Sequence, residues 1–305
     1  MSFLVTDAFV QQFTGTVRML AQQGASRLRP CVIEDSMPAE GGYMEQIAPV
    51  VARKRISRHA DTPLMITQHL RRRLATYDWE WADLVDNIDR LRLIIDPTSN
   101  YANAAAMSLG RAIDDEILSA MFGVAYTGHA GGTSISWPAG NSESTPTTAG
   151  GTVVSVNSWA YGNGSGITGL TISKLIEANV GLKAAEGDEN EEKYIVVTAI
   201  DEAQLLGTTE ATSADYNLRP TLADGRIMRF MGFTFIHSER VQLDASNYRL
   251  LPAWRKSAMG FGVTQDISSR ISERPDKSYA WQVYASMSVG AARLEEAKLA
   301  QIKCQ

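Results

Sequence analysis

The side chains most often used for catalysis and metal binding are scattered along this chain. Its histidines and cysteines are His59, His69, His129, His237, Cys31 and Cys304. They form neither an HExxH motif nor the paired Cys and His spacings of zinc sites. A GxSxG nucleophile elbow and a GxxxxGKS/T phosphate loop are also missing from the sequence. The spacing therefore predicts no catalytic residue and no metal site.

Three adjacent acidic residues, Asp114, Asp115 and Glu116, come nearest to a carboxylate pair for acid–base catalysis. In a helix, consecutive side chains point in different directions, so these carboxylates do not converge on one proton. Arg111 precedes the first two by three and four residues, the spacing at which helical side chains meet. We therefore expect Arg111 to be their partner.

One nucleotide-binding pattern is present. Residues 164–169 read GSGITG, a formal GxGxxG, ahead of a helix expected over Thr171–Ala185. In a dinucleotide site the glycines directly follow a strand, whereas here the apolar run 153–156 ends well before Gly164. Asp188 stands roughly where a ribose-binding acid would fall, within an acidic run. A nicotinamide-dependent oxidoreductase is thus an alternative, but we predict a flexible turn and no cofactor.

Residues 50–95 carry a marked charge segregation and supply the candidate contact residues. Basic side chains are followed by acidic ones: Arg53, Lys54, Arg55, Arg58, Arg71, Arg72, Arg73, Asp78, Glu80 and Asp83. The apolar residues of Val50–Ile56 and Leu64–Leu70 predict a hairpin, which is marginal alone and needs a partner surface. We predict that these charges meet complementary patches on other copies of the chain.

Two other interpretations of this segment stay open. Most charged runs are solvated faces without a binding role. Nucleic-acid binding would use Tyr77, Trp79 and Trp81 beside the arginines. The acidic neighbours and a net charge of -5 over 305 residues argue against a protein whose main role is to grip DNA.

The composition places the chain among ordinary globular proteins. With 44% hydrophobic residues it can form a sizeable core, and its length suggests about two domains. No run approaches the roughly 18 apolar residues of a membrane span, and we expect no secretory signal because the N-terminus lacks a basic start. Two isolated cysteines favour a reducing compartment.

The clearest element that would position these residues is a helix over Ser99–Gly123. Apolar side chains recur there at three- and four-residue steps, which is typical of one buried helical face. Asp114 and Asp115 fall mostly off this face. Small residues, among them Ala105 and Gly110, leave the first half thin, so we expect another backbone to approach it closely.

The remaining pattern predicts an α+β fold. Before the long helix we expect a short helix ending near Gly24 and an extended strap over residues 30–50. Residues 124–170 read as a long exposed loop with a strand within Thr152–Asn157.

Residues 171–255 read as a compact α/β unit, and the end of the chain is strand-like. The unit would hold a helix over Thr171–Ala185, a buried strand over Tyr194–Ile200, a short helix over Glu202–Leu206 capped by Asp201, and two short strands bent at Gly232. Alternation over Trp281–Val289, a bulge or bend at Gly290 and a last strand over Leu299–Cys304 follow.

Three stretches in this order resemble the major capsid proteins of tailed bacteriophages, which have the Hong Kong 97 type fold. The first is YANAAAMSLGRAID, residues 101–114, which resembles the family's spine helix. The second is LADGRIMRFMGFTFI, residues 222–236, similar to a recurring strand pair. The third combines WRKSAM, residues 254–259, with GAARLE, residues 290–295, and resembles the closing strands.

The resemblance implies an architecture of four parts. These are an N-terminal arm (1–42), an extended loop (43–80), a peripheral domain holding the spine helix (81–170 and 256–305) and an axial domain (171–255). It also implies a structural role without enzymatic activity, in which five- and six-membered rings close into an icosahedral shell around double-stranded DNA.

The implied partners are further copies of the chain, packaged DNA held without sequence-specific binding, and scaffolding, portal and decoration proteins, with no membrane. The implied location is the virion, after assembly in the cytoplasm of a bacterial host. A protein nanocompartment shell that holds cargo enzymes is the alternative within the same fold.

Overall fold

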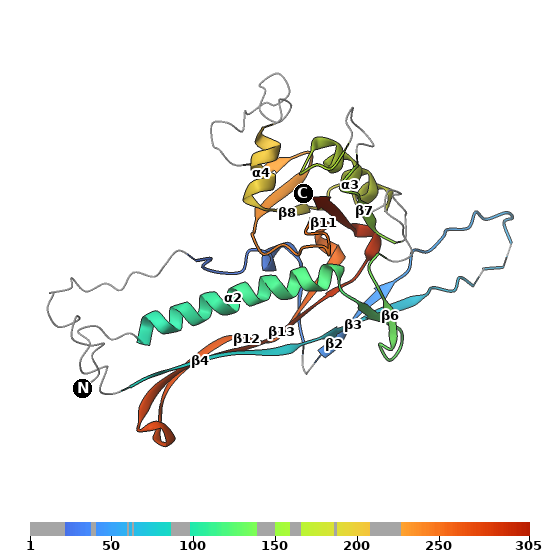
Figure 1. Cartoon of the computed structure of the whole chain (residues 1–305). Coiled ribbons are helices and arrows are strands. Elements are labelled where there is room, and N and C mark those ends of the chain that lie inside the picture. Colours follow the sequence, from blue (N-terminus) through green and yellow to red (C-terminus); the bar gives the residue numbers. More distant parts are fainter. Residues whose placement is uncertain are drawn as a thin grey trace. The chain divides into compact units, whose positions relative to one another are not determined.

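The computed structural model describes residues 22–37, 41–59, 61–62, 64–86, 98–138, 150–158, 166–185, 188–207 and 227–305 (Figure 1). The contacts divide the chain into two compact units. The first comprises the described parts of Met1–Ser26, Asp78–Ala112 and Gln265–Ser288, and the second comprises those of Arg27–Tyr77, Ile113–Thr264 and Val289–Gln305. The expected helix near the N-terminus lies outside the described residues.

The long helix is confirmed as α2, Thr98–Phe122. Within the first unit its Ala105 side chain is fully buried. A Cβ added to Gly110 would lie 3.1 Å from the backbone nitrogen of Ser26 and 3.2 Å from Ala25 Cα. The expected close approach of another backbone is therefore present, and it is made by residues 25–26.

A four-stranded sheet runs in the order β1-β12-β13-β4. Its strands are β1 (Ile33–Ser36), β12 (Met259–Arg274), β13 (Ala280–Arg293) and β4 (Tyr77–Val85). The alternation expected over Trp281–Val289 is confirmed, because Val283, Ala285 and Met287 are buried. Gly290 lies within β13, where a Cβ would overlap the Ala75 carbonyl oxygen, so close passage of β13 past residue 75 requires glycine.

A six-stranded sheet in the second unit runs in the order β7-β14-β11-β8-β10-β9. Its strands are β7 (Thr152–Val154), β14 (Leu299–Cys304), β11 (Arg249–Arg255), β8 (Lys193–Val197), β10 (Phe233–His237) and β9 (Arg229–Phe230). Helix α3 (Ile172–Ala184) and the sheet enclose an apolar core that includes Leu175, Ile195 and Ile302.

Two expectations for this unit need correction at the end of β8. The strand ends at Val197 and helix α4, Ala199–Leu206, begins two residues later, so neither the strand to Ile200 nor the later helix start was right. The N-cap is Thr198, and Asp201 completes a capping box from within the helix.

The other predictions for this unit agree with the structure. The β9–β10 hairpin turns at Met231 and Gly232, both with positive φ, which confirms the bend at Gly232. Strand β14 confirms the predicted last strand, and β7 lies within the predicted Thr152–Asn157. Short 3₁₀ turns lie at Arg29–Cys31, Lys256–Ala258, Pro275–Lys277 and Glu296–Lys298.

A third sheet runs in the order β2-β3-β5-β6. Its strands are β2 (Gly41–Ile47), β3 (His69–Ala75), β5 (Ala125–Thr127) and β6 (Thr133–Ile135). Strands β1 and β2 replace the expected irregular strap over 30–50, and β5 and β6 interrupt the loop expected over 124–170. The predicted α+β class is confirmed.

The hairpin was predicted in the right region but at the wrong residues. Strand β2 pairs antiparallel with β3, and the described residues between 48 and 68 are not strand. The physical reason is core contact: Met44 of β2 and Leu74 of β3 are buried in one apolar cluster with Leu294. Residues 50–56 have no such cluster to pack on.

Candidate functional site

Residues 48–68 continue from the β2–β3 hairpin and carry the predicted basic residues. The Ala48 backbone nitrogen donates to the Gln68 carbonyl oxygen at 3.0 Å, and beyond this pair the chain extends away from the sheet (Figure 1). Within the described residues, Arg53, Lys54 and Arg58 have no hydrogen bond or ion pair. These cations are therefore available to another molecule.

The same segment exposes large apolar side chains. The most exposed are Leu64 at 92%, Ile66 at 88% and Ile56 at 85%. Exposed apolar residues gathered on one segment, beside unpaired charges, are typical of a surface that a partner covers. We define residues 48–68 as the basic loop. Arg55 belongs to it too, and its Nε donates to the Ser57 carbonyl oxygen at 2.8 Å.

The three arginines of β3 have different surroundings. Arg71 is half-buried, pairs with Glu45 at 2.8 Å and lies over the Tyr43 ring at 5.1 Å. Arg73 is exposed. Arg72 is buried, and its Nη2 donates to Glu296 at 2.6 Å. Because its guanidinium is bound within its own chain, Arg72 is left out of the contact surface proposed below.

Glu296 also contacts a second buried guanidinium, that of Arg293, at 3.3 Å. Arg293 Nη1 donates to the carbonyl oxygens of Met121 and Gly123 at 2.9 Å each. Its Nη2 donates to the Ile135 carbonyl oxygen at 3.1 Å. Through Arg72, this cluster holds strand β3 against the end of α2 and strand β6. It therefore anchors the strand that follows the basic loop. Sequence reasoning missed it; the i,i+3 spacing of Arg293 and Glu296 was the available signal.

The acidic candidates lie on β4 in the first unit, where Asp78, Glu80 and Asp83 are exposed. Tyr284 donates to Glu80 at 3.3 Å. Within the described residues, Asp78 has no hydrogen bond or ion pair, and Asp83 has no ion pair but accepts a hydrogen bond from the backbone nitrogen of its neighbour Leu84 at 2.8 Å. Their pairing with basic residues of another copy stays a prediction.

The acidic run after α3 is engaged within its own chain. Glu191 accepts a hydrogen bond from the Ser257 backbone nitrogen at 2.7 Å and lies 3.8 Å from Arg255. Glu192 accepts from the Tyr194 hydroxyl at 2.5 Å. Burial, together with this hydrogen bond, raises the pKa of Tyr194. Glu191 and Glu192 therefore are not free partners for the basic loop.

The three adjacent acidic residues of α2, Asp114, Asp115 and Glu116, also have different surroundings. Asp114 is fully buried, not off the apolar face as expected, and accepts hydrogen bonds from the backbone nitrogens of Arg27 and Leu28 at 3.1 Å. Asp115 pairs with Arg240. Arg111, the predicted partner, donates instead to Gln22 and to the Gln23 carbonyl oxygen, at 2.9 and 3.4 Å.

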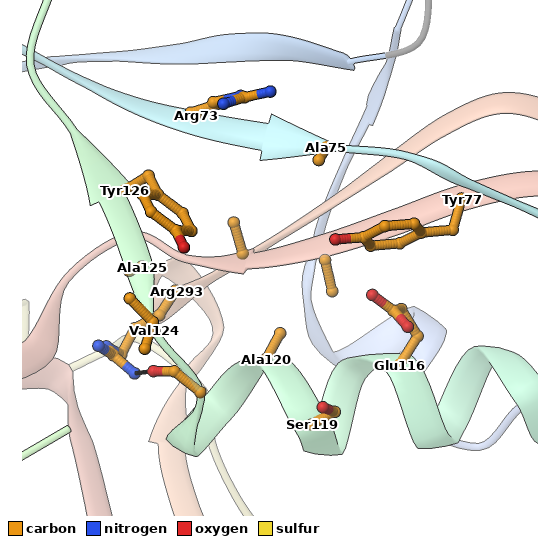
Figure 2. Close-up of a pocket in the computed structure, with 13 residues that line it drawn as sticks. Arg73, Ala75, Tyr77, Glu116, Ser119, Ala120, Val124, Ala125, Tyr126 and Arg293 are labelled. Carbon is orange, nitrogen blue, oxygen red and sulfur yellow. Dashed lines mark hydrogen bonds between the residues drawn. The ribbon is translucent and has the colours of Figure 1, made fainter. Parts of the chain in front are cut away.

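Glu116 lines a cavity of about 410 Å³ at the end of α2 (Figure 2). The rings of Tyr77 and Tyr126 lie on either side of it, and their hydroxyls point toward one another across the space. Arg73 and Arg293 also line it. Burial raises the pKa of Glu116. The sequence contained no signal that would have brought these residues together, since they come from five separate elements.

Of the glycine pattern at residues 164–169, the structure describes residues 166–169. Strand β7 ends at Val154, and residues 155–158 after it are not strand. Gly166, in a left-handed conformation, follows much later, and α3 begins at Ile172. Among the described residues there is no cluster of three metal-binding side chains. No helix in the described part of the chain is long and apolar enough to span a membrane.

Comparison with known proteins gives a consistent result. A family model described as "Phage capsid protein" matches residues 5–305. The capsid of cyanophage P-SCSP1u is similar in structure, with a TM-score of 0.71, 13% identity and coverage of 98% of this chain and 94% of that one. A comparison with curated proteins finds no match.

Two further solved structures show the same likeness. The capsid of a native GTA particle has a TM-score of 0.69 at 14% identity, covering 96% of this chain and 94% of that one. The capsid of Ralstonia phage GP4 has a TM-score of 0.65 at 11% identity, covering 97% and 95%. At these identities the likeness establishes the fold.

Proposed function

Because this chain belongs to the phage capsid protein family, we propose that its copies form five- and six-membered rings that close into an icosahedral shell. The chain is a structural capsid protein, and its place is the capsid of the virion. The proposed shell encloses double-stranded DNA and assembles in the cytoplasm of a bacterial host. Scaffolding, portal and decoration proteins are proposed partners.

The observation that carries the assembly proposal is the basic loop. In a single chain it leaves Ile56, Leu64 and Ile66 exposed to water, and each such side chain gains roughly 1.5–3 kcal/mol when fully buried. The unpaired Arg53 and Lys54 beside them gain a partner only from another molecule. A second copy that covers the loop satisfies both requirements.

The geometry of such a contact favours rings. A projecting loop on one copy that binds a different surface of the next makes a head-to-tail contact, and repeated contacts of this kind close into rings when the rotation permits. The net charge of -5 suits a container that should not adhere tightly to its contents.

We also propose the four-part Hong Kong 97 type architecture for this chain. Its parts are the arm (1–42), the extended loop (43–80), the peripheral domain (81–170 and 256–305) and the axial domain (171–255). The long α2 within the third of these parts, and strands β8, β10 and β11 with helix α3 within the fourth, support this assignment.

The shell is tested by sedimentation and negative-stain electron microscopy of recombinant protein, with and without a candidate scaffolding protein. We expect closed particles with five- and six-fold clusters. A strict monomer under every salt and scaffold condition would overturn the proposal. Particles from a natural source distinguish the two shell types: a phage head contains DNA, whereas a nanocompartment contains protein cargo.

We further propose that the protein has no enzymatic activity and that residues 164–169 bind no nucleotide. The gap between β7 and Gly166 supports this, because it separates the glycines from a strand end. Titration with nicotinamide cofactors should leave the tryptophan fluorescence unchanged. Saturable micromolar quenching that is lost in Gly166→Val would contradict the proposal.

A further inference from the structure

The cavity beside α2 contains a carboxylate without a partner. Among the described residues, Glu116 has no hydrogen bond and no ion pair. Arg73 and Arg293 line the same cavity, yet burial is the one cause that shifts the Glu116 pKa, and neither arginine lowers it. Arg293 is bound to Glu296 and to backbone carbonyl groups. The carboxylate therefore lacks a cation that would offset its desolvation.

The rest of the lining suits a long basic side chain. Tyr77 and Tyr126 are 58% and 45% exposed, and their rings flank the opening (Figure 2). Aromatic rings attract ammonium and guanidinium groups, and the methylene stem of lysine or arginine packs on apolar surface. Small apolar residues supply that surface: Ala75, Ala120, Val124, Ala125, Ala291 and Ala292.

A basic side chain from the same basic loop does not reach this cavity. Residue 73 of β3 lines it, and the strand leads away from it to residue 69, which pairs with residue 47 of β2. From residue 73 to residue 69, and from residue 47 on to residue 53, there are ten residues, which span at most roughly 33 Å. Beyond the Ala48–Gln68 pair the chain extends away from the sheet (Figure 1). The cations of the loop and the Glu116 carboxylate are thus complementary but separated within one subunit.

We propose that the Glu116 cavity is the receptor for one basic side chain, Arg53, Lys54 or Arg58, from the basic loop of a second copy. The inference rests on the proposed shell and names the surface that the loop binds. The head group pairs with the Glu116 carboxylate, the stem packs on the alanines, and Tyr77 and Tyr126 close over it. Each subunit then donates a loop on one side and offers a cavity on the other.

The direct test is carbodiimide cross-linking of assembled shells, which joins a carboxylate to a lysine amine in contact. Shells are assembled from equal amounts of ¹⁵N-labelled and unlabelled subunits of the wild type, of Arg53→Lys and of Arg58→Lys. We expect mass spectrometry to identify a mixed-isotope peptide pair joining Glu116 to a loop lysine in at least one of the three. The absence of a cross-link from Glu116 to a loop lysine in all three would overturn the inference.

The second test separates assembly from folding. Because Glu116 has no partner in the isolated subunit, Glu116→Gln should leave its melting temperature unchanged or slightly higher. The subunit concentration needed for shells should rise about tenfold or more. Glu273→Gln, at an exposed carboxylate on β12, is the matched control and should assemble as the wild type does.

The outcomes distinguish the two proposals. If Glu116→Gln forms shells at the same subunit concentration as the wild type, this inference is overturned and the shell proposal stands. A large loss of melting temperature in Glu116→Gln would also overturn it, because the residue would then serve the fold of its own subunit. A wild-type chain that never forms shells would overturn the proposed function itself.

Discussion

At the scale of single residues, Glu296 holds two buried guanidiniums, those of Arg72 and Arg293, at the base of the basic loop. Two cations that share one carboxylate in the interior depend on it strongly, because neither has water to replace it. This arrangement makes Glu296 a structural residue whose loss affects the subunit before any assembly occurs.

We therefore expect Glu296→Gln to destabilise the unassembled subunit by roughly 3–5 kcal/mol, the cost of leaving a buried charge without its partner. Urea-induced unfolding measures it. Its neighbour Glu295 is the matched control: its side chain is 44% exposed and pairs with Lys298. Glu295→Gln should cost less than about 1 kcal/mol. Equal effects of the two variants would show that the cluster contributes no more than a surface pair.

From the buried thiol of Cys304 we expect the free energy of unfolding to fall at alkaline pH. Burial raises the pKa of its thiol from 9.0 to about 12. Below pH 9 the thiol is protonated in both states and stability is unaffected. Between pH 9 and about 12 the unfolded chain ionises and the folded chain does not, so the free energy of unfolding falls by about 1.4 kcal/mol per pH unit.

The measurement is urea unfolding between pH 8 and 10.5, compared with Cys304→Ala, which should show a shallower decline above pH 9. The comparison is needed because other groups contribute. Burial also raises the pKa of Cys31, to about 11, and this shift likewise lowers the free energy of unfolding as the pH rises. Burial lowers the pKa of Lys174, which acts in the opposite direction. Parallel curves for wild type and variant would contradict the assignment to Cys304.

At the scale of elements, the first half of α2 consists largely of small residues that pack closely against a neighbouring segment, so it has no room for larger side chains. Ala105 is fully buried, and Gly110 lies against the backbone of residues 25–26. Alanine is the strongest helix former, but glycine is one of the weakest, so helix propensity alone does not explain Gly110; the small side chains here leave room for a neighbouring segment.

Ala105→Leu should therefore overpack this face and cost roughly 1–3 kcal/mol of subunit stability. Ala106→Leu is the matched control, because residue 106 lies next to it on the same helix and is exposed. Thermal unfolding followed by circular dichroism measures both. If Ala105→Leu melts like the wild type, the small residues serve only as helix formers.

At the scale of the whole molecule, the basic loop should matter for assembly and not for folding. Arg53, Lys54 and Arg55 are exposed and make no ion pair within the described residues, so they add little to the stability of one subunit. Across an interface, each like-charge contact costs several kcal/mol, and a shell repeats that cost at every subunit.

Changing all three residues to Glu should leave a soluble subunit with near-native melting that does not form shells. Raising the salt concentration should partly restore assembly, because the Debye length is only about 8–10 Å near physiological salt and shorter above it. Sedimentation at low and high salt measures both effects. Normal shells at low salt would show that these charges face solvent, and an unfolded variant would show that they belong to the subunit's own contacts.

The sequence by itself determined the elements whose pattern is local. Helices α2 and α3, the last strand and the turn at Gly232 follow from residues within one turn or one strand of each other, so periodicity and turn chemistry were enough. The order of three stretches along the chain also pointed to the capsid family, which the family model supports over residues 5–305.

Only the tertiary structure decided where the hairpin pairs and which charges are free. Apolar patterning alone favoured residues 50–56, but Met44 and Leu74 find a core and those residues do not. Likewise Arg72 and Arg73 are adjacent in sequence, yet a strand sends them to opposite faces, and Glu296, more than 200 residues away, decides that Arg72 is buried. Burial and ion pairing depend on contacts between distant segments, and no local pattern records them.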